Sequence, residues 1–189
     1  LYPYPNLLPD AIHPNPEGAG ILARTVYSGI TGNYGGLQMS QLYTDYMVLQ
    51  RNVPLDIHGT ANAGDKVTVS IDRQTVTATA DNQGKWCAVL QPMEAADDLT
   101  LTVKAGRQTN VYRHVAVGEV WLCSGQSNMA FILCQAESYK RDINNANDPQ
   151  LRLYDMKGRW ETYDVAWPAS CLDSLNHLQY YRHTTWQPT

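Results

Sequence analysis

The sequence has few charges and no concentration of either sign. Charged residues make up 17% of its 189 residues, the formal net charge is −4, and lysine and arginine form no run. Phosphate backbones and anionic lipid surfaces are bound through clustered basic side chains, so nucleic-acid and membrane-surface partners are not expected. No stretch approaches the ~20 apolar residues of a spanning helix, and residues 1–5 lack the basic and then apolar pattern of an export signal. We therefore expect no membrane insertion.

The cysteines also lack the spacing of a metal site. There are four of them, with no CxxC pair and no histidine at ligand spacing, so a metal site is not expected. Cys87 and Cys123 lie in apparent strands, where a small buried side chain is the expectation. The 43% of hydrophobic residues is enough for a folded core.

Residues 1–36 carry the signals of one helix. Asn15 is a favourable N-cap and is followed by proline, then by a periodic apolar run, which predicts a helix over about residues 16–30. Gly29 and Gly32 supply its end. The glycine-rich residues 32–36 predict a linker without regular structure.

Apolar and polar side chains alternate in short runs of residues 37–117. Turn-forming residues at 62–65, 72–74 and 81–84 separate these runs. Short strands at such regular spacing predict a small antiparallel β-sandwich. The apolar positions of the expected strands are Val67, Val69, Ile71, Val76, Trp86, Ala88, Leu90, Leu99, Leu101, Val103, Val111, Val115 and Val117.

Residues 118–189 change to an α/β pattern. An apolar strand is expected at 119–123, a helix at 129–133 and a second strand at 151–154. Strand, tight turn, helix and strand form the opening unit of a parallel α/β sheet. One such unit lacks the covering elements of a complete domain. The predicted fold is therefore mixed: an all-β antiparallel sandwich flanked by incomplete α/β pieces.

Ser127 is a candidate nucleophile. It follows an apolar strand and a turn through Gly125, and a helix is expected after it. Such an elbow exposes the hydroxyl and directs helix N-terminal amides at developing negative charge. The alternative is that Ser127 only caps the helix.

Asp10 and His13 are a candidate aspartate–histidine pair, in which His13 would act as a general base. A carboxylate three residues before a histidine can fix the imidazole tautomer and leave the other ring nitrogen as a base. The alternative is a surface histidine beside a turn-forming aspartate. The other histidines lack such a neighbour and are interpreted as strand or loop residues: His58, His114, His177 and His183.

The segment VGEVWLCSGQSNM at residues 117–129 resembles the nucleophile block of the sialate O-acetylesterase-like carbohydrate esterases of the SGNH hydrolase superfamily. DYMVLQR at 45–51 and ADNQGKW at 80–86 resemble the β-sandwich that precedes the catalytic domain of that family. The resemblance covers roughly residues 37 to 160. It implies that Ser127 attacks the acetyl carbonyl of an acetylated sugar. The resemblance gives the Ser127 amide as one oxyanion donor. Gln126 and Asn128 flank the serine and are candidates to orient it or the acetyl group, or to bind the oxyanion.

The segment DAIHPNPEGA at residues 10–19 resembles the last catalytic block of SGNH hydrolases, which implies that His13 is a general base oriented by Asp10. In that superfamily the serine comes first, so the order here is reversed. A tandem esterase explains the order: residues 1–36 are the tail of one SGNH domain, residues 37–117 the sandwich, and residues 118–189 the start of a second, flavodoxin-like SGNH domain. The alternative is that Asp10 and His13 complete the Ser127 site within the chain or across a dimer.

The resemblance implies a serine esterase that removes O-acetyl groups from a carbohydrate, without a cofactor and incomplete in this fragment. Sialate and plant-polysaccharide esters both fit, and a sialate carboxylate would need an arginine such as Arg152 or Arg159. The implied partners are an acetylated glycan and the remainder of the tandem esterase, and the implied setting is an exported bacterial protein. The alternatives are a carbohydrate-binding or spacer module, in which Trp86 is expected to face the core rather than a sugar, and a lipase-like hydrolase.

Overall fold

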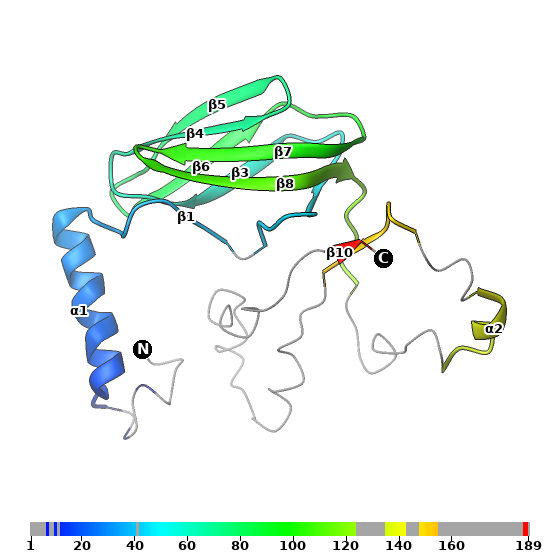
Figure 1. Cartoon of the computed structure of the whole chain (residues 1–189). Helices are drawn as coiled ribbons and strands as arrows, with labels where there is room; N and C mark the ends of the chain where they lie inside the picture. The colour runs from blue at the N-terminus through cyan, green and yellow to red at the C-terminus, as the bar shows by residue number, and fades with distance from the viewer. Residues whose placement is uncertain are drawn as a thin grey trace.

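The structure is a computed structural model with a long helix ahead of a strand-rich region (Figure 1). It is mixed in class, with few helices. The described residues are Leu7, Asp10, 12–40, 42–123, 135–142, 148–154 and 187–188. The expected helix at 129–133, Cys134 and Cys171 lie outside them.

Helix α1 spans Pro16–Thr31, as the sequence predicts. The side-chain oxygen of Asn15 accepts the Gly18 N–H at 2.8 Å and so caps the first turn. Gly32, with φ 71°, ends the helix through its N–H bond to the Ser28 carbonyl. Gly29 was an expected end and is instead internal, because the helical hydrogen bonds continue through it to Gly32.

The larger sheet has five strands in the order β2-β8-β7-β4-β5. Its hairpins are antiparallel, as predicted. β2 pairs with β8 in parallel, which the prediction of an antiparallel sheet missed because the two strands are far apart in sequence. The strands are β2 (Val48–Gln50), β4 (Lys66–Ile71), β5 (Gln74–Thr79), β7 (Ala96–Ala105) and β8 (Gln108–Gly118).

The smaller sheet has three antiparallel strands in the order β1-β3-β6. They are β1 (Gln38–Met39), β3 (Leu55–Thr60) and β6 (Lys85–Leu90).

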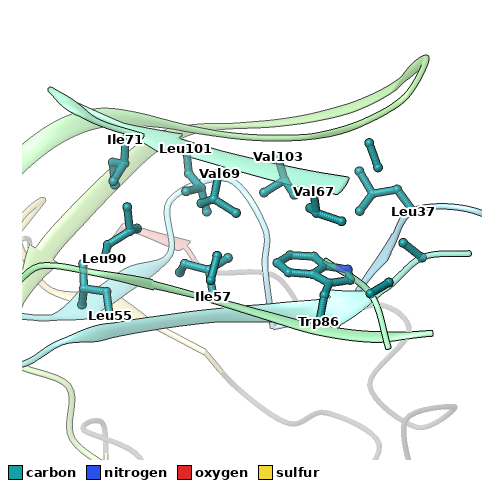
Figure 2. Packing of buried hydrophobic residues seen from close by; sticks show 14 of the residues in the cluster. Leu37, Leu55, Ile57, Val67, Val69, Ile71, Trp86, Leu90, Leu101 and Val103 are labelled. Atoms are coloured by element: carbon teal, nitrogen blue, oxygen red, sulfur yellow. The ribbon is translucent and has the colours of Figure 1, made fainter. Parts of the chain in front are cut away.

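The hydrophobic core lies between these two sheets (Figure 2). The alternation seen in the sequence decides which side chains enter it. In β4, Val67, Val69 and Ile71 are buried while the residues between them are not, and Trp86, Ala88 and Leu90 repeat the pattern in β6. Trp86 faces the core, as expected, with 4% of its surface exposed.

Two irregularities interrupt the pairing of β7 with β8. They break the alternation, because an inserted residue moves the following side chains to the other face. Val115 and Val117 are buried, as the pattern predicts, but Val111 is 39% exposed.

The glycine-rich residues 32–36 have no helix or strand, as predicted, yet they are held against the sheets. The hydroxyl of Tyr34 donates to the carbonyl of Asn82 at 2.9 Å, and the Gly36 N–H donates to the side chain of Asn62 at 3.1 Å. A Cβ at Gly36 would lie 2.1 Å from Oε1 of Gln108. Gly36 also has a φ of 79°, in the left-handed region that favours glycine.

The strand expected at residues 119–123 is absent, because β8 ends at Gly118. Among the described residues no strand pairs with this stretch, so its backbone has no ladder to join. Trp121 and Leu122 are consequently exposed. The strand expected at 151–154 is present as β9 (Arg152–Leu153), but it pairs antiparallel with β10 (Gln187–Pro188) and not in a parallel sheet. The remaining helix, α2, is a single turn at Tyr139–Asp142.

Both described cysteines are exposed, which contradicts the expectation of burial. Cys87 lies on the outer face of β6, one position out of phase with the buried residues. Cys123 lies in the stretch that does not form a strand.

Candidate active site

Asp10 and His13 form a close pair just ahead of α1. Nδ1 of His13 lies 2.6 Å from Oδ2 of Asp10. Oδ1 of Asp10 accepts the backbone N–H groups of His13 at 2.6 Å and Ile12 at 3.0 Å. Both carboxylate oxygens are therefore engaged by the turn that follows, which fixes the aspartate beside the imidazole.

The electrostatics of this pair favour the charged carboxylate. The hydrogen bond from His13, with the backbone N–H groups of His13 and Ile12, lowers the pKa of Asp10 to about 2. An ionised carboxylate only accepts hydrogen bonds, so Nδ1 of a neutral His13 carries the ring proton and Nε2 holds the lone pair. The imidazole is 79% exposed. The pair thus presents an oriented base to the solvent.

The start of α1 positions the pair. The N–H of Asn15 donates to the carbonyl of Leu7 at 2.9 Å, and Leu7 is buried. With the Asn15 cap on Gly18, this bond ties the turn to the first turn of the helix. This geometry confirms the prediction from the sequence that the Asp10 carboxylate reaches the His13 ring.

The other predicted site residues lie outside the described residues. These are Ser127, Gln126 and Asn128. The relation of His13 to Ser127, whether in one site or two, therefore stays a prediction.

A second histidine–aspartate pair was missed from the sequence. Nδ1 of His114 lies 2.7 Å from Oδ1 of Asp98, and the His114 ring stacks on Tyr46 at 4.8 Å between centroids. The two partners come from different strands, so no local spacing in the sequence signals the pair.

Arg152 is not available for a substrate carboxylate. Its side chain is 5% exposed and is paired with Asp97 and with backbone carbonyls. The sequence-based suggestion that it binds a sialate is therefore wrong, because the guanidinium is already occupied. Arg159, the other candidate, lies outside the described residues.

An open groove of about 630 Å³ lies beside β1. Tyr43 and Tyr112 line it, with ring centroids 6.3 Å apart. Burial raises the pKa of both tyrosines, so their hydroxyls remain protonated and able to donate at neutral pH. The rest of the lining is Leu37, Gln38, Met39, Ser40, Thr109, Asn110 and Val111.

The described part of the chain holds neither a candidate metal cluster nor a helix that could span a membrane. No group of three or more His, Cys, Asp or Glu side chains there is placed to hold a metal ion. None of the helices described is long and apolar enough to span a bilayer.

The comparisons with known proteins confirm the resemblance seen in the sequence. No family model matches. The chain is 27% identical to a sialate O-acetylesterase of Rattus norvegicus, over 86% of this chain and 34% of that protein. It is 31% identical to a sialate O-acetylesterase of Pongo abelii, over 58% of this chain and 23% of that protein. A solved carbohydrate acetylesterase from Xanthomonas citri superposes with a TM-score of 0.58 and 34% identity, over 62% of this chain and 27% of that one.

The chain spans about a quarter to a third of the length of the curated relatives it matches. Over that shared part, it is related to the sialate O-acetylesterase-like carbohydrate esterases.

Proposed function

We propose that the protein is a carbohydrate O-acetylesterase that uses Ser127 as its nucleophile. The observation that carries the proposal of serine-hydrolase chemistry is the Asp10–His13 pair, at 2.6 Å, which has the geometry of a hydrolase's base whichever serine it serves. The choice of Ser127 as nucleophile follows from the family resemblance of residues 117–129. The similarity to proteins named as sialate O-acetylesterase and carbohydrate acetylesterase supplies the reaction class.

The proposed reaction is acyl transfer in two steps. The base takes the proton of the Ser127 hydroxyl, and the serine oxygen bonds to the acetyl carbon. The carbon–oxygen bond to the sugar then breaks, and the sugar oxygen takes the proton from the base. Water hydrolyses the acetyl-serine, which releases acetate and restores the hydroxyl. The Ser127 amide, with Gln126 or Asn128, stabilises the oxyanion in this scheme.

The proposed organisation is that of a tandem esterase. Residues 1–36 end one SGNH domain, residues 37–117 form a β-sandwich, and residues 118–189 begin a second SGNH domain. Leu22, Val26 and Ile30 lie four residues apart on α1 and are all exposed, which supports a helix that packs on a domain beyond the described residues. In this scheme Asp10 and His13 serve a different serine.

Hydrolysis of p-nitrophenyl acetate by the purified chain tests this organisation. Under the tandem scheme the chain shows no turnover that depends on both Ser127 and His13. If Ser127→Ala and His13→Ala each lower turnover by about 10³-fold or more, the two residues share one site and the tandem scheme fails. His58→Ala is the matched control, because His58 is an exposed histidine on β3.

A fluorophosphonate probe tests the nucleophile in a longer protein that includes the flanking sequence. Covalent labelling that is lost in Ser127→Ala supports the esterase. Hydrolysis of acetylated glycans that survives Ser127→Ala excludes Ser127 as the nucleophile.

A second candidate function is glycan binding without catalysis, and the groove with Tyr43 and Tyr112 favours it. Its volume is in the range of ligand sites, and tyrosine rings combine an apolar face with a hydroxyl. Tyr112→Ala would weaken binding of the chain to a glycan, whereas Tyr27→Ala, on the exposed side of α1, would not. Glycan binding without probe labelling supports this reading.

The finer assignments follow the family resemblance. We propose an acetylated sialate or plant polysaccharide as substrate and export from a bacterial cell as the setting. Release of acetate from each class of acetylated glycan separates the two substrates.

A further inference from the structure

Arg152 of β9 inserts into an acceptor-lined pocket of the larger sheet. Its NH1 group donates to the backbone carbonyls of Tyr46 at 3.2 Å, Met47 at 3.5 Å and His114. Its NH2 group donates to Oδ1 of Asp97 and forms an ion pair with it. These partners come from the stretch before β2, from β7 and from β8, all distant from Arg152 in sequence.

The aromatic ring of Tyr46 forms one side of this pocket. The guanidinium carbon of Arg152 lies 5.9 Å from the centre of the Tyr46 ring, within the range of cation–π attraction. His114 stacks on Tyr46, and Asp98 holds the His114 ring through Nδ1. The ring that contacts Arg152 is therefore itself fixed in orientation.

Two irregularities of the sheet shape the part of the pocket that β7 and β8 contribute. The β7–β8 pairing shifts between Ala96 and Leu99 and again between Leu99 and Leu101. Asp98 and His114 lie at these shifts with φ angles of 56° and 55°, in the left-handed region that residues other than glycine rarely adopt. Bulges of this kind redirect groups that would otherwise join the ladder. Here one such group is the His114 carbonyl, which accepts from Arg152.

The chemistry of the pocket matches arginine. Three carbonyls and one carboxylate provide only acceptors, and a guanidinium provides donors in a fixed planar fork with no acceptor. A lysine ammonium is more compact and lacks this fork. The side chain is nearly fully buried, and Nε has no hydrogen-bond partner among the described residues. Burial of a charge on this scale requires such partners.

We infer that the double bulge of β7 and β8, together with the stretch before β2, is a receptor for Arg152. This contact docks β9 on the two-sheet unit, which consists of the two sheets that enclose the core. β9 follows the Ser127 segment in the sequence, so docking fixes the chain downstream of the proposed nucleophile against the sheets. The two-sheet unit is then a structural partner of β9 and not an independent spacer. The inference does not depend on the proposed esterase activity.

Hydrogen–deuterium exchange of the whole chain tests the docking. In Arg152→Met, which keeps length and removes every donor, we expect the amides of Leu151 and Leu153 to exchange about tenfold faster or more, because hydrogen bonds to a charged group are lost. The core amides of Val69 and Val103 should keep their rates. Arg141→Met is the matched control, since the Arg141 side chain is 80% exposed and pairs only with its neighbour Asp142 among the contacts described.

Two more variants complete the test. Arg152→Lys should loosen β9 nearly as much as Arg152→Met, because charge alone cannot replace the planar fork. Asp97→Ala removes an exposed carboxylate and should raise β9 exchange several-fold even if the Arg152 variants fail to fold. Unchanged β9 exchange in Arg152→Met or, where that variant does not fold, in Asp97→Ala overturns the inference. An equal acceleration of β9 and core amides also overturns it, since Arg152 would then stabilise the sheets without docking β9.

Discussion

Gly59 of β3 lies directly against the indole of Trp86 and the backbone of β1. A Cβ at Gly59 would stand 2.9 Å from Cζ2 of Trp86 and 2.4 Å from the carbonyl oxygen of Gln38. Gly59 pairs with Trp86 on one side and with Met39 on the other. The missing side chain therefore lets three strands meet around the buried indole.

Gly59→Ala should destabilise the two-sheet unit. A methyl group there meets backbone, which cannot move without shifting β1, so we expect a loss of about 1–3 kcal/mol in the free energy of unfolding. Gly118→Ala is the control, because its Cβ would meet Val48 at an ordinary 3.6 Å. Urea unfolding followed by tryptophan fluorescence measures both. Equal effects of the two substitutions would show that the close approach carries no energetic cost.

The titration of Asp10 should report its pairing with His13. We expect the carboxyl to titrate at about 2 and to return toward its ordinary value of 3.8 in His13→Ala. Because this pKa is lowered in the ordered turn, the carboxylate stabilises the turn above pH 3.8, and that contribution is lost as the pH falls through about 2. Carboxyl-carbon NMR measures the midpoint, with His58→Ala as control. A midpoint unaffected by His13→Ala would contradict the assigned hydrogen bond.

Truncating a strand side chain should destabilise the protein strongly only where the alternation directs that side chain into the core between the two sheets. Val69 is fully buried between the sheets, whereas Val89 on β6 is 48% exposed. Val69→Ala should cost about 2–3 kcal/mol from lost methyl burial and a residual cavity, and Val89→Ala under about 1 kcal/mol. Denaturant midpoints compare the two. Similar losses would place Val69 outside the core.

Two positions of α1, the Asn15 cap and Gly29 within the helix, should affect the stability of the helix in opposite directions. Asn15→Ala removes the oxygen that accepts the Gly18 N–H and should cost about 1 kcal/mol of helix stability. Gly29→Ala should act in the opposite direction by about 0.5–1 kcal/mol, since Gly29 is helical and a Cβ there meets nothing within 4 Å. Amide exchange within α1 measures both changes. A loss of protection in Gly29→Ala would contradict the open surroundings of that position.

The local features of the fold were predictable because their signals are local. The N-cap at Asn15, the alternation through β4 and β6, and the reach of Asp10 to His13 each involve residues within a few positions of one another. The resemblance carried by residues 117–129 was also readable from the sequence, and the comparisons confirm it. The catalytic role of Ser127 remains a prediction, because Ser127 lies outside the described residues.

Most of the errors share a physical cause, which is contact between distant segments. The burial of Arg152 and the pairing of His114 with Asp98 depend on two bulges in adjacent strands. The exposure of Cys87 depends on which face of β6 meets the core, although its phase relative to Trp86 already contained that information. The stretch at 119–123 has strand propensity, but no described strand lies beside it to accept its backbone bonds.

The sequence by itself determined the helix, the alternation that sorts core from surface, and the turn that joins Asp10 to His13. These follow from backbone capping, from the two-residue period of a strand and from the reach of a short side chain. Only the tertiary structure decided that β2 runs parallel to β8 and that Arg152 lies buried beneath Tyr46. The reason is that the acceptors around Arg152, among them the His114 carbonyl at a bulge, come from segments far apart in the sequence and meet only in the folded chain.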